Sequence, residues 1–312
     1  MRVLLWHVHG AWTTSFVHGP HTYLIPVLPD RGPDGRGRAR TYEWPGNAIE
    51  VTPDEAAETP VDAVVLQRPE ELAGLAERWL GGRRPGRDLP AVYVEHNAPQ
   101  GRINEMRHPA ADRPDLTLVH VTHFNALFWD AGSIPTRVIE HGVVDPGPRY
   151  SGELRRAAVV VNEPARRARV TGTDLLPALD EPMPIDLFGI GAGSLGGIED
   201  LPQARLHEEM ARRRAYLHPI RWTSLGLSLI EAMHLGMPVV ALATTEVAEA
   251  VPPEAGVVSN RLEVLRDALA RLADDPRAAA EMGAAAREAA LRRYGLGRFL
   301  TDWNELLEEV TS

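Results

Sequence analysis

The 312-residue sequence contains no cysteine and no lysine. Without cysteine the chain cannot form disulfides, thiolate zinc sites or a cysteine nucleophile. Without lysine all 33 basic residues are arginines, so any phosphate must be held by guanidinium groups or by backbone amides. The candidate groups for binding an anion are therefore arginine side chains and the backbone amides at helix amino termini.

Long apolar runs and an excess of basic charge are missing too. No run approaches the roughly 20 apolar residues of a membrane span. The start, MRVLLWHVHGAW, is interrupted by histidines and lacks a small-residue cleavage site, so it predicts a first strand and not a signal peptide. We therefore expect a soluble, cytoplasmic protein without a transmembrane segment. The net charge of -10 argues against general nucleic-acid binding, which needs a basic surface.

Short β-like runs alternate with helical segments along the whole chain, as in parallel α/β sheets. The chain length suits two domains, and the Pro- and Gly-rich stretch DPGPRYSG at 145–152 predicts the linker. We expect a first domain at 1–148, a second at 149–295, and a final amphipathic helix at 296–312 that can pack back on the first domain.

Two features of the sequence are weak indicators of a site. The hexapeptide GAGSLG at 191–196 matches G-x-G-x-x-G, but GIEDLPQ follows it in place of an amphipathic helix, which favours a strand-to-loop turn over a dinucleotide site. Nine of the 12 histidines precede residue 142, yet no carboxylate set completes a ligand group, so no metal is expected. His96, in YVEHN, ends a predicted strand; it is either a cleft residue or a structural histidine.

An arginine-rich loop follows the first predicted strand of the second half. The segment NEPARRARVTGTDLL at 162–176 places Arg166, Arg167 and Arg169 between a strand and a helix. Three guanidinium groups in such a loop suit a diphosphate, and a solvated loop is the alternative.

The segment RWTSLGLSLIEAMHLGMPVVAL at 221–242 combines a small-residue loop with an apolar helix that carries one carboxylate, Glu231. Ser224 or Thr223 can cap this helix, and Gly226 lets a ligand approach the backbone. Free amides at the helix start favour an anion, while an inward Glu231 can accept hydrogen bonds from a ribose diol. A nucleoside diphosphate satisfies both, and a solvated Glu231 is the alternative.

These motifs, in this order, resemble a GT-B glycosyltransferase of the retaining family-4 type (glycosyl transferases group 1). EAMHLGMPVVA at 231–241 is similar to the family pattern E-A-M-A-x-G-x-P-V-V-A, VIEHGVVDP at 138–146 to I-P-N-G-V-D, and TGTDLL at 171–176 to K-G-x-D-L-L. The resemblance implies an α/β fold of two Rossmann-like doubly wound domains facing a cleft. It also implies transfer of a sugar from a nucleotide diphosphate sugar to a small-molecule or glycan acceptor, with retention and without a metal or other cofactor.

The resemblance assigns roles to individual residues. The second domain would bind the donor, and the first the acceptor. The donor-binding residues are Arg166, Arg167, Arg169, Thr223, Ser224, Leu225, Gly226 and Glu231; the acceptor-binding residues are His9, Gly10, Trp12 and Thr13; the catalytic residue is His96. Thr223 replaces the first glutamate of the family pattern and Thr171 its lysine, which is why we assign the phosphate contacts to the three arginines. A catalytically silent nucleotide-sugar-binding protein and a GT-B nucleotide-sugar epimerase are the alternatives.

Overall fold

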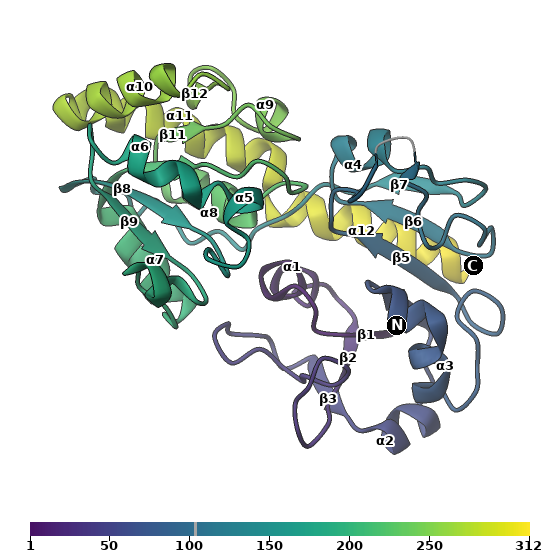
Figure 1. Ribbon diagram of the computed structural model, residues 1–312. Helices are drawn as coiled ribbons and strands as arrows, with labels where there is room; N and C mark the ends of the chain where they lie inside the picture. Colours follow the sequence, from purple (N-terminus) through teal and green to yellow (C-terminus); the bar gives the residue numbers. More distant parts are fainter. Residues whose placement is uncertain (103–104) are drawn as a thin grey trace. The chain divides into compact units, whose positions relative to one another are not determined.

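The computed structural model describes residues 1–102 and 105–312 and divides the chain into two compact units. Unit 1 comprises Met1–Gly142 and Leu296–Ser312, and unit 2 comprises Val143–Gly295. The chain thus enters unit 2 within the segment VIEHGVVDP, upstream of the boundary expected at 148. Its last helix returns to unit 1, where both termini lie (Figure 1).

Seven parallel strands form the sheet of unit 1, in the order β3-β2-β1-β4-β5-β6-β7. Strands β2 and β3 extend the sheet on one side of β1, and β4 to β7 extend it on the other. The chain therefore reverses its direction of winding between β1 and β4, the point at which doubly wound sheets bind ligands. The strands are β1 (Arg2–Leu5), β2 (Thr22–Pro26), β3 (Ala48–Val51), β4 (Ala63–Leu66), β5 (Ala91–Glu95), β6 (Thr117–His120) and β7 (Thr136–Val138).

Helices cover both faces of this sheet. On one face Trp303 of the last helix packs against Trp12 and Phe16, with ring centroids 5.6 and 5.1 Å away. On the other face Trp79 and Leu75 pack with strand residues such as Leu4. The helices of unit 1 are α1 (Gly10–Phe16), α2 (Pro53–Glu58), the π-helical turn η1 (Glu71–Leu75), α3 (Ala76–Trp79), α4 (His123–Phe128) and α12 (Leu296–Thr311).

Unit 2 has a five-stranded parallel sheet in the order β12-β11-β10-β8-β9. Here the winding reverses between β8 and β10, because β9 lies beside β8 on one side while β11 and β12 continue from β10 on the other. The strands are β8 (Leu154–Val160), β9 (Ile185–Phe188), β10 (Arg213–His218), β11 (Val239–Ala241) and β12 (Gly256–Val258).

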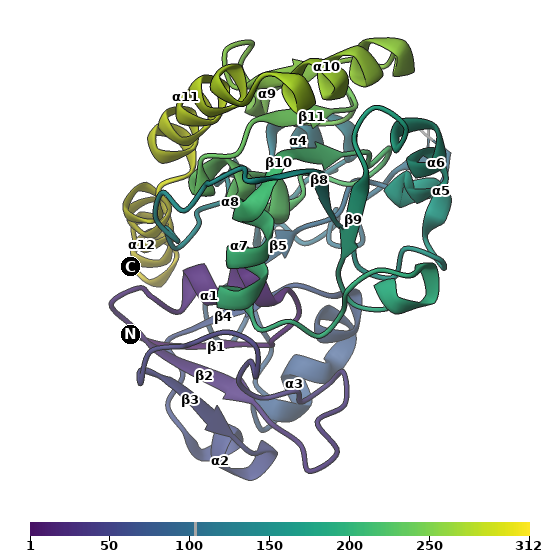
Figure 2. The ribbon, with the colours of Figure 1, turned by 90° about the vertical axis from the view of Figure 1, so that its left-hand side faces the viewer.

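Alternate residues of β8 enter two separate cores. Ala157 and Val159 pack with Leu265 of α10, whereas Ala158 packs with Ile230 of α8 and Ala286 of α11. Helices therefore cover both faces of the second sheet (Figure 2). They are α5 (Ala168–Thr171), η3 (Thr173–Leu175), α6 (Leu176–Leu179), η4 (Ala192–Leu195), α7 (Gln203–Arg212), α8 (Leu227–Leu235), α9 (Val247–Ala250), α10 (Leu262–Asp274) and α11 (Pro276–Tyr294). Two doubly wound α/β units match the fold class expected from the sequence.

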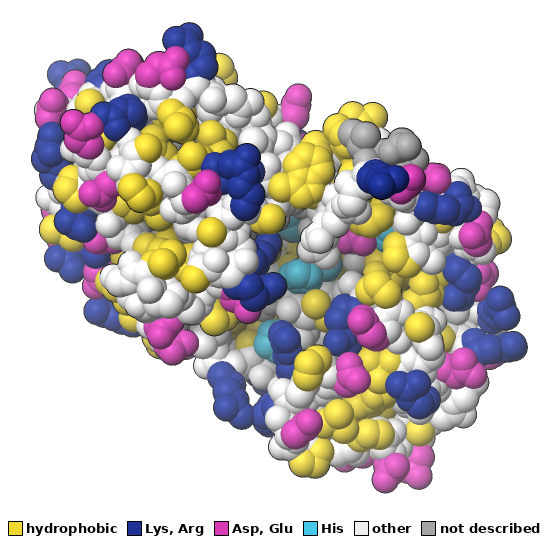
Figure 3. Space-filling view, in the orientation of Figure 1, with side chains coloured by type: hydrophobic (Ala, Val, Ile, Leu, Met, Phe, Trp, Pro, Cys, Tyr) yellow, Lys and Arg dark blue, Asp and Glu magenta, His cyan; other side chains and the backbone are white. Residues whose placement is uncertain are grey.

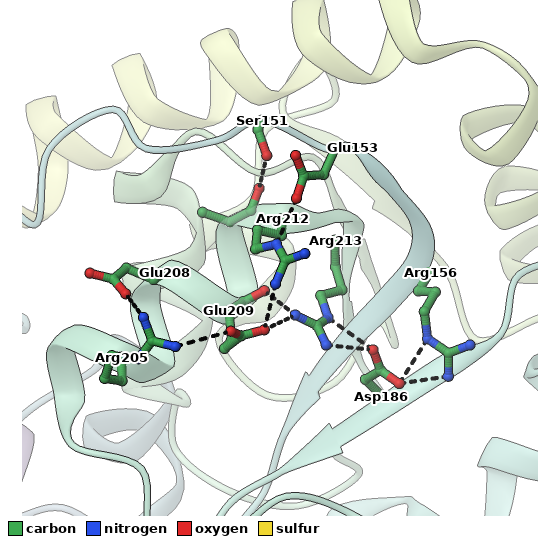
Figure 4. A network of polar contacts seen from close by, with 10 residues as sticks. Ser151, Glu153, Arg156, Asp186, Arg205, Glu208, Glu209, Arg212 and Arg213 are labelled. Atoms are coloured by element: carbon green, nitrogen blue, oxygen red, sulfur yellow. Dashed lines mark hydrogen bonds and ion pairs between the residues drawn. The ribbon is translucent and has the colours of Figure 1, made fainter.

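An ion-pair network ties the amino ends of three strands of unit 2 together (Figure 4). Asp186 near the start of β9 binds Arg156 of β8 at 2.6 Å and Arg213 of β10 at 2.8 Å. Arg213 also pairs with Glu209 of α7. This network lies at the amino ends of the strands, where it holds the three strands in register. The carboxyl ends of the strands, at the opposite side of the sheet, remain available to ligands.

No described helix is long and apolar enough to cross a membrane.

Candidate functional site

Two loops meet at the carboxyl ends of β8 and β10, where the winding of unit 2 reverses. The backbone N–H of Arg221, after β10, donates to the carbonyl of Val170, after β8, at 2.9 Å. Gly172 has φ +72°, and a Cβ there would lie 1.8 Å from the carbonyl oxygen of Pro219. Only glycine allows this approach. The structure thus brings together the arginine-rich loop and the segment that leads into α8.

The three arginines of this loop differ in their partners. Arg166 pairs with Glu163, and Arg169 lies 3.7 Å from Asp174; both side chains are largely exposed, at 71% and 81%. Arg167 forms no ion pair with a carboxylate in the part of the chain that the structure describes, although its charge helps to lower the pKa of Glu163. Arg167 is therefore the guanidinium group of this loop that is most readily offered to a ligand.

Arg221 joins the same cluster, which the sequence analysis did not anticipate. Its guanidinium group binds both carboxylate oxygens of Asp174, at 2.5 and 2.9 Å, and donates to the carbonyl of Arg169 at 2.9 Å. The ion pair with Arg221 holds the pKa of Asp174 below its usual value. Four guanidinium groups thus accompany two carboxylates here, which leaves an excess of positive charge suited to an anion. In the sequence, a role for Arg221 at this site was indicated by its position directly before the Trp-Thr-Ser loop.

Helix α8 begins after Gly226, and among the described residues no side chain caps it by a hydrogen bond. The prediction that Ser224 or Thr223 caps the helix is wrong. The helix starts later than the sequence suggested, and Ser224 and Leu225 are buried instead. Thr223 remains partly exposed. The cap position is thus held by Gly226, which has no side chain to accept from the first amides of α8, as in anion sites at helix amino termini.

Glu231 lies in the second turn of α8 and is only 6% exposed. Its Oε1 accepts a hydrogen bond from Nε2 of Gln203 on α7 at 2.8 Å, and its Oε2 lies 3.6 Å from Nε2 of His207. The amide of Gln203 also donates to Nε2 of His207 at 2.8 Å. A buried carboxylate needs a donor such as the Gln203 amide. Gln203 and His207 were missed in the sequence, where their i,i+4 spacing on one helix was the only sign.

In unit 1, His96 directly follows β5 and is 8% exposed. Its Nε2 lies 3.0 Å from Oε1 of Gln67, and the amide Nε2 of Gln67 donates to the carbonyl of Trp6 at 2.7 Å. Gln67 follows β4 and Trp6 follows β1, so this contact spans the reversal point of the first sheet. Because the amide orientation of Gln67 is set by Trp6, Nε2 of His96 carries the proton and Nδ1 keeps its lone pair. Burial holds the pKa of His96 well below its usual value, so the ring is neutral.

Two of the expected acceptor residues, His9 and Trp12, lie beside His96. The ring of His9 is 4.2 Å from that of His96, and Trp12 meets the same ring edge-on at 4.9 Å. Gly10 lies against the ring of Tyr42, because a Cβ added to Gly10 would be only 2.9 Å from Cε2 of Tyr42. The side chains of Trp12 and Thr13 on α1 are fully buried, which leaves them without surface to offer an acceptor. Burial lowers the pKa of His9 to about 4, which keeps this ring neutral as well.

Because His141 is buried, we expect unit 1 to lose stability as the pH falls. Burial lowers its pKa to about 3 from 6.5, so the unfolded chain binds a proton that the folded chain does not as the pH falls through 6.5. The free energy of unfolding is thus greatest above about pH 7 and falls by about 2 kcal/mol between pH 7 and pH 5 for one such histidine. Urea unfolding of the wild type and of His141→Gln at both pH values measures this. The variant should show a fall smaller by that amount; equal falls would contradict the assignment.

In residues 1–102 and 105–312, no three His, Asp or Glu side chains come together as metal ligands. On the face drawn in Figure 3, arginines are interspersed with acidic side chains over both units. This face therefore carries no broad surface of basic charge alone.

Comparison with known proteins agrees with this architecture. Residues 198–289 match the family described as "Glycosyl transferases group 1", a segment that contains α7, α8 and Glu231. None of the curated proteins matches the sequence.

Among solved structures, sucrose-phosphate synthase from Thermosynechococcus elongatus is similar with a TM-score of 0.71 at 14% identity, over 99% of this chain and 98% of that chain. Anabaena HepE in complex with UDP and glucose is similar with a TM-score of 0.71 at 15% identity, over 99% and 100%. TarM from S. aureus gives a TM-score of 0.61 at 14% identity over 78% of this chain, which spans only 55% of TarM. The chain therefore has the GT-B fold, and its residues 198–289 are similar to the glycosyl transferases group 1.

Proposed function

We propose that the protein is a glycosyltransferase that moves a sugar from a nucleotide diphosphate sugar to an acceptor, with retention of configuration. The observation that carries the proposal is the meeting, at the β8/β10 reversal, of an arginine cluster, an uncapped helix start and a buried carboxylate. These three features match the diphosphate and the ribose of one ligand. The match of residues 198–289 and the complex of HepE with UDP support the same reading.

The donor would be held entirely by residues of unit 2. Arg167, with Arg166 and Arg169 around it, binds the diphosphate together with the first amides of α8. Glu231 accepts hydrogen bonds from the ribose diol. Thr223 and the backbone of the Ser224–Gly226 loop contact the phosphates and the sugar. As the bond between the anomeric carbon and the diphosphate breaks, negative charge grows on the leaving phosphate, and the guanidinium groups and amides stabilise it without reorganising.

The acceptor would bind to unit 1 near His9 and Gly10. Its hydroxyl oxygen forms the new bond to the anomeric carbon, and its proton passes to the departing phosphate on the same face, which retains the configuration. His96 offers the lone pair of Nδ1 to a hydroxyl of the reacting sugar and so orients that sugar. In this scheme the arginines and backbone amides of unit 2 stabilise the negative charge that develops on the leaving phosphate.

Replacing Arg166, Arg167 and Arg169 together with alanine should weaken binding of a nucleoside diphosphate by at least about tenfold, the effect of losing one charge-assisted hydrogen bond. Arg167→Ala alone should account for most of this, because Arg166 and Arg169 are engaged with Glu163 and Asp174. Isothermal titration calorimetry with the three single variants and the triple variant measures it. A triple variant that binds like the parent means that the loop is merely solvated.

A catalytically silent nucleotide-sugar-binding protein is the second candidate, and the uncharged Thr223 favours it. Measuring donor binding and nucleotide release on the same panel of donors and acceptors separates the two. A transferase releases nucleoside diphosphate when a suitable acceptor is present. A silent binder takes up donor and releases none, and an epimerase returns the donor with an inverted sugar centre.

A further inference from the structure

An arginine-rich loop, residues 31–40, follows β2 in unit 1 and is tied to the carboxyl end of β1. Trp6 and His7 directly follow β1. Nε1 of Trp6 donates to the carbonyl of Asp34 at 3.0 Å. Nδ1–H of His7 donates to the carbonyl of Gly37 at 3.0 Å, because a carbonyl oxygen can only accept. The loop is therefore fixed beside the reversal point of the first sheet, where the acceptor is proposed to bind.

The main chain around Arg36 has a defined conformation. A Cβ on Gly35 would lie 2.6 Å from the backbone nitrogen of Leu28, so this position requires glycine. Gly37 has φ +67°, in the left-handed region that favours glycine. The carbonyl of Arg36 accepts a hydrogen bond from Nη1 of Arg31 at 3.1 Å. Arg36 is thus held between two buried glycines while its own residue surface is exposed.

The four arginines of this loop differ in what they bind. Arg31 pairs with Glu50 at 2.8 Å. Arg38 donates to two backbone carbonyls of the segment that follows the loop, at 3.1 and 2.6 Å. Arg36 and Arg40 are exposed, and neither forms an ion pair within residues 1–102 and 105–312. These two guanidinium groups are accessible to a ligand.

Of these two arginines, Arg36 is the one whose charge acts on the expected acceptor site. After burial, its charge is the largest cause of the lowered pKa of His9, and it also lowers the pKa of His7. Neither Arg40 nor any carboxylate of the described chain is among the causes of these two shifts. Both histidine residues are partly exposed. Arg36 therefore places a positive charge beside neutral imidazole rings, which suits an anionic ligand.

We propose that Arg36 binds an anionic group of the acceptor, so that the acceptor is a molecule carrying a phosphate or a carboxylate and not a neutral sugar. A guanidinium group pairs with either anion through two parallel hydrogen bonds. The neutral ring of His9 can hydrogen-bond a hydroxyl of the same molecule. The inference rests on the proposed function and narrows its acceptor to an anionic compound.

The test compares three sugars that share one ring skeleton: glucose, glucose 6-phosphate and glucuronate. Titration calorimetry with UDP and GDP comes first, and the nucleotide that binds is then kept at saturation to occupy the arginines of unit 2. NMR signals of His7 and His9 follow the titration with each sugar. Both anionic sugars should bind about fivefold or more tightly than glucose, the effect of one ion pair at an exposed site. The larger gain distinguishes a phosphate from a carboxylate as the preferred group.

Three variants locate the preference. Arg36→Gln should remove it and leave the affinity for glucose unchanged, and Arg36→Lys should restore part of it. Arg40→Gln, the matched control from the same loop, should keep the wild-type preference. If the wild type binds the anionic sugars no more tightly than glucose, or if Arg36→Gln keeps the preference, the inference is refuted while nucleotide binding by unit 2 stands. If neither UDP nor GDP binds, the proposed function fails, and the inference fails with it.

Discussion

Replacing His96 with alanine should lower turnover by about 100-fold or more and change donor affinity by less than about threefold. Loss of the group that orients the reacting sugar costs about 100-fold in rate, whereas the nucleotide contacts in this scheme come from unit 2. The neutral ring, with its proton on Nε2 and its lone pair on Nδ1, is what Gln67 and burial together produce. Steady-state kinetics with the donor varied at saturating acceptor separates kcat from KM.

Two comparisons sharpen this test. Gln67→Ala removes the partner of Nε2 and should lower kcat about tenfold, because the ring is no longer held in one orientation. His108→Ala removes another buried histidine of unit 1, which binds Glu95 at 3.1 Å, and should reduce stability without changing kcat of the folded enzyme. If His96→Ala retains the turnover of the wild type, His96 is a structural histidine.

Glu231→Gln should weaken binding of nucleoside diphosphates by about 10- to 100-fold, equivalent to about 1.5–3 kcal/mol for a hydrogen bond to a charged group. The substitution keeps the shape of the side chain, but a neutral amide accepts from a ribose hydroxyl less strongly than a carboxylate does. The new amide group also lies beside the amide of Gln203, which donates to Oε1 of Glu231 in the wild type. Titration calorimetry measures the loss.

Two controls accompany this variant. Thr223→Ala should cost only about two- to threefold, because a short neutral hydroxyl makes at most one weak hydrogen bond to the donor. Glu209→Gln removes a carboxylate from α7 that pairs with Arg213 at the opposite edge of the sheet, so it should lower stability and leave donor affinity unchanged. Normal binding by Glu231→Gln would mean that the donor site lies elsewhere.

The sequence predicted the strands and helices that carry strong periodic patterns. The apolar run that ends in EAMHLGMPVVA produced α8 and β11, because its Gly and Pro end the helix and its branched residues suit a buried strand. Helix α1 carries no such pattern. GAWTTSF contains few strong helix formers, and α1 is stabilised by burying Trp12 and Phe16 against α12, which follows about 280 residues later.

The parts of the site that could not be predicted are those made by distant segments. The partner of Glu231 is Gln203, 28 residues away, and that of His96 is Gln67, 29 residues away. Local sequence patterns contain no information about such pairs. The predicted cap at Ser224 failed because α8 begins at Leu227, so that Gly226 holds the cap position.

A crystal structure with a bound nucleoside diphosphate, UDP first and then GDP, tests the central claim most directly. The account predicts the diphosphate at the amino terminus of α8 with Arg167 turned towards it, and the ribose hydroxyls within hydrogen-bond distance of Glu231. A nucleotide bound away from the β8/β10 reversal, or one whose ribose does not contact Glu231, would contradict it.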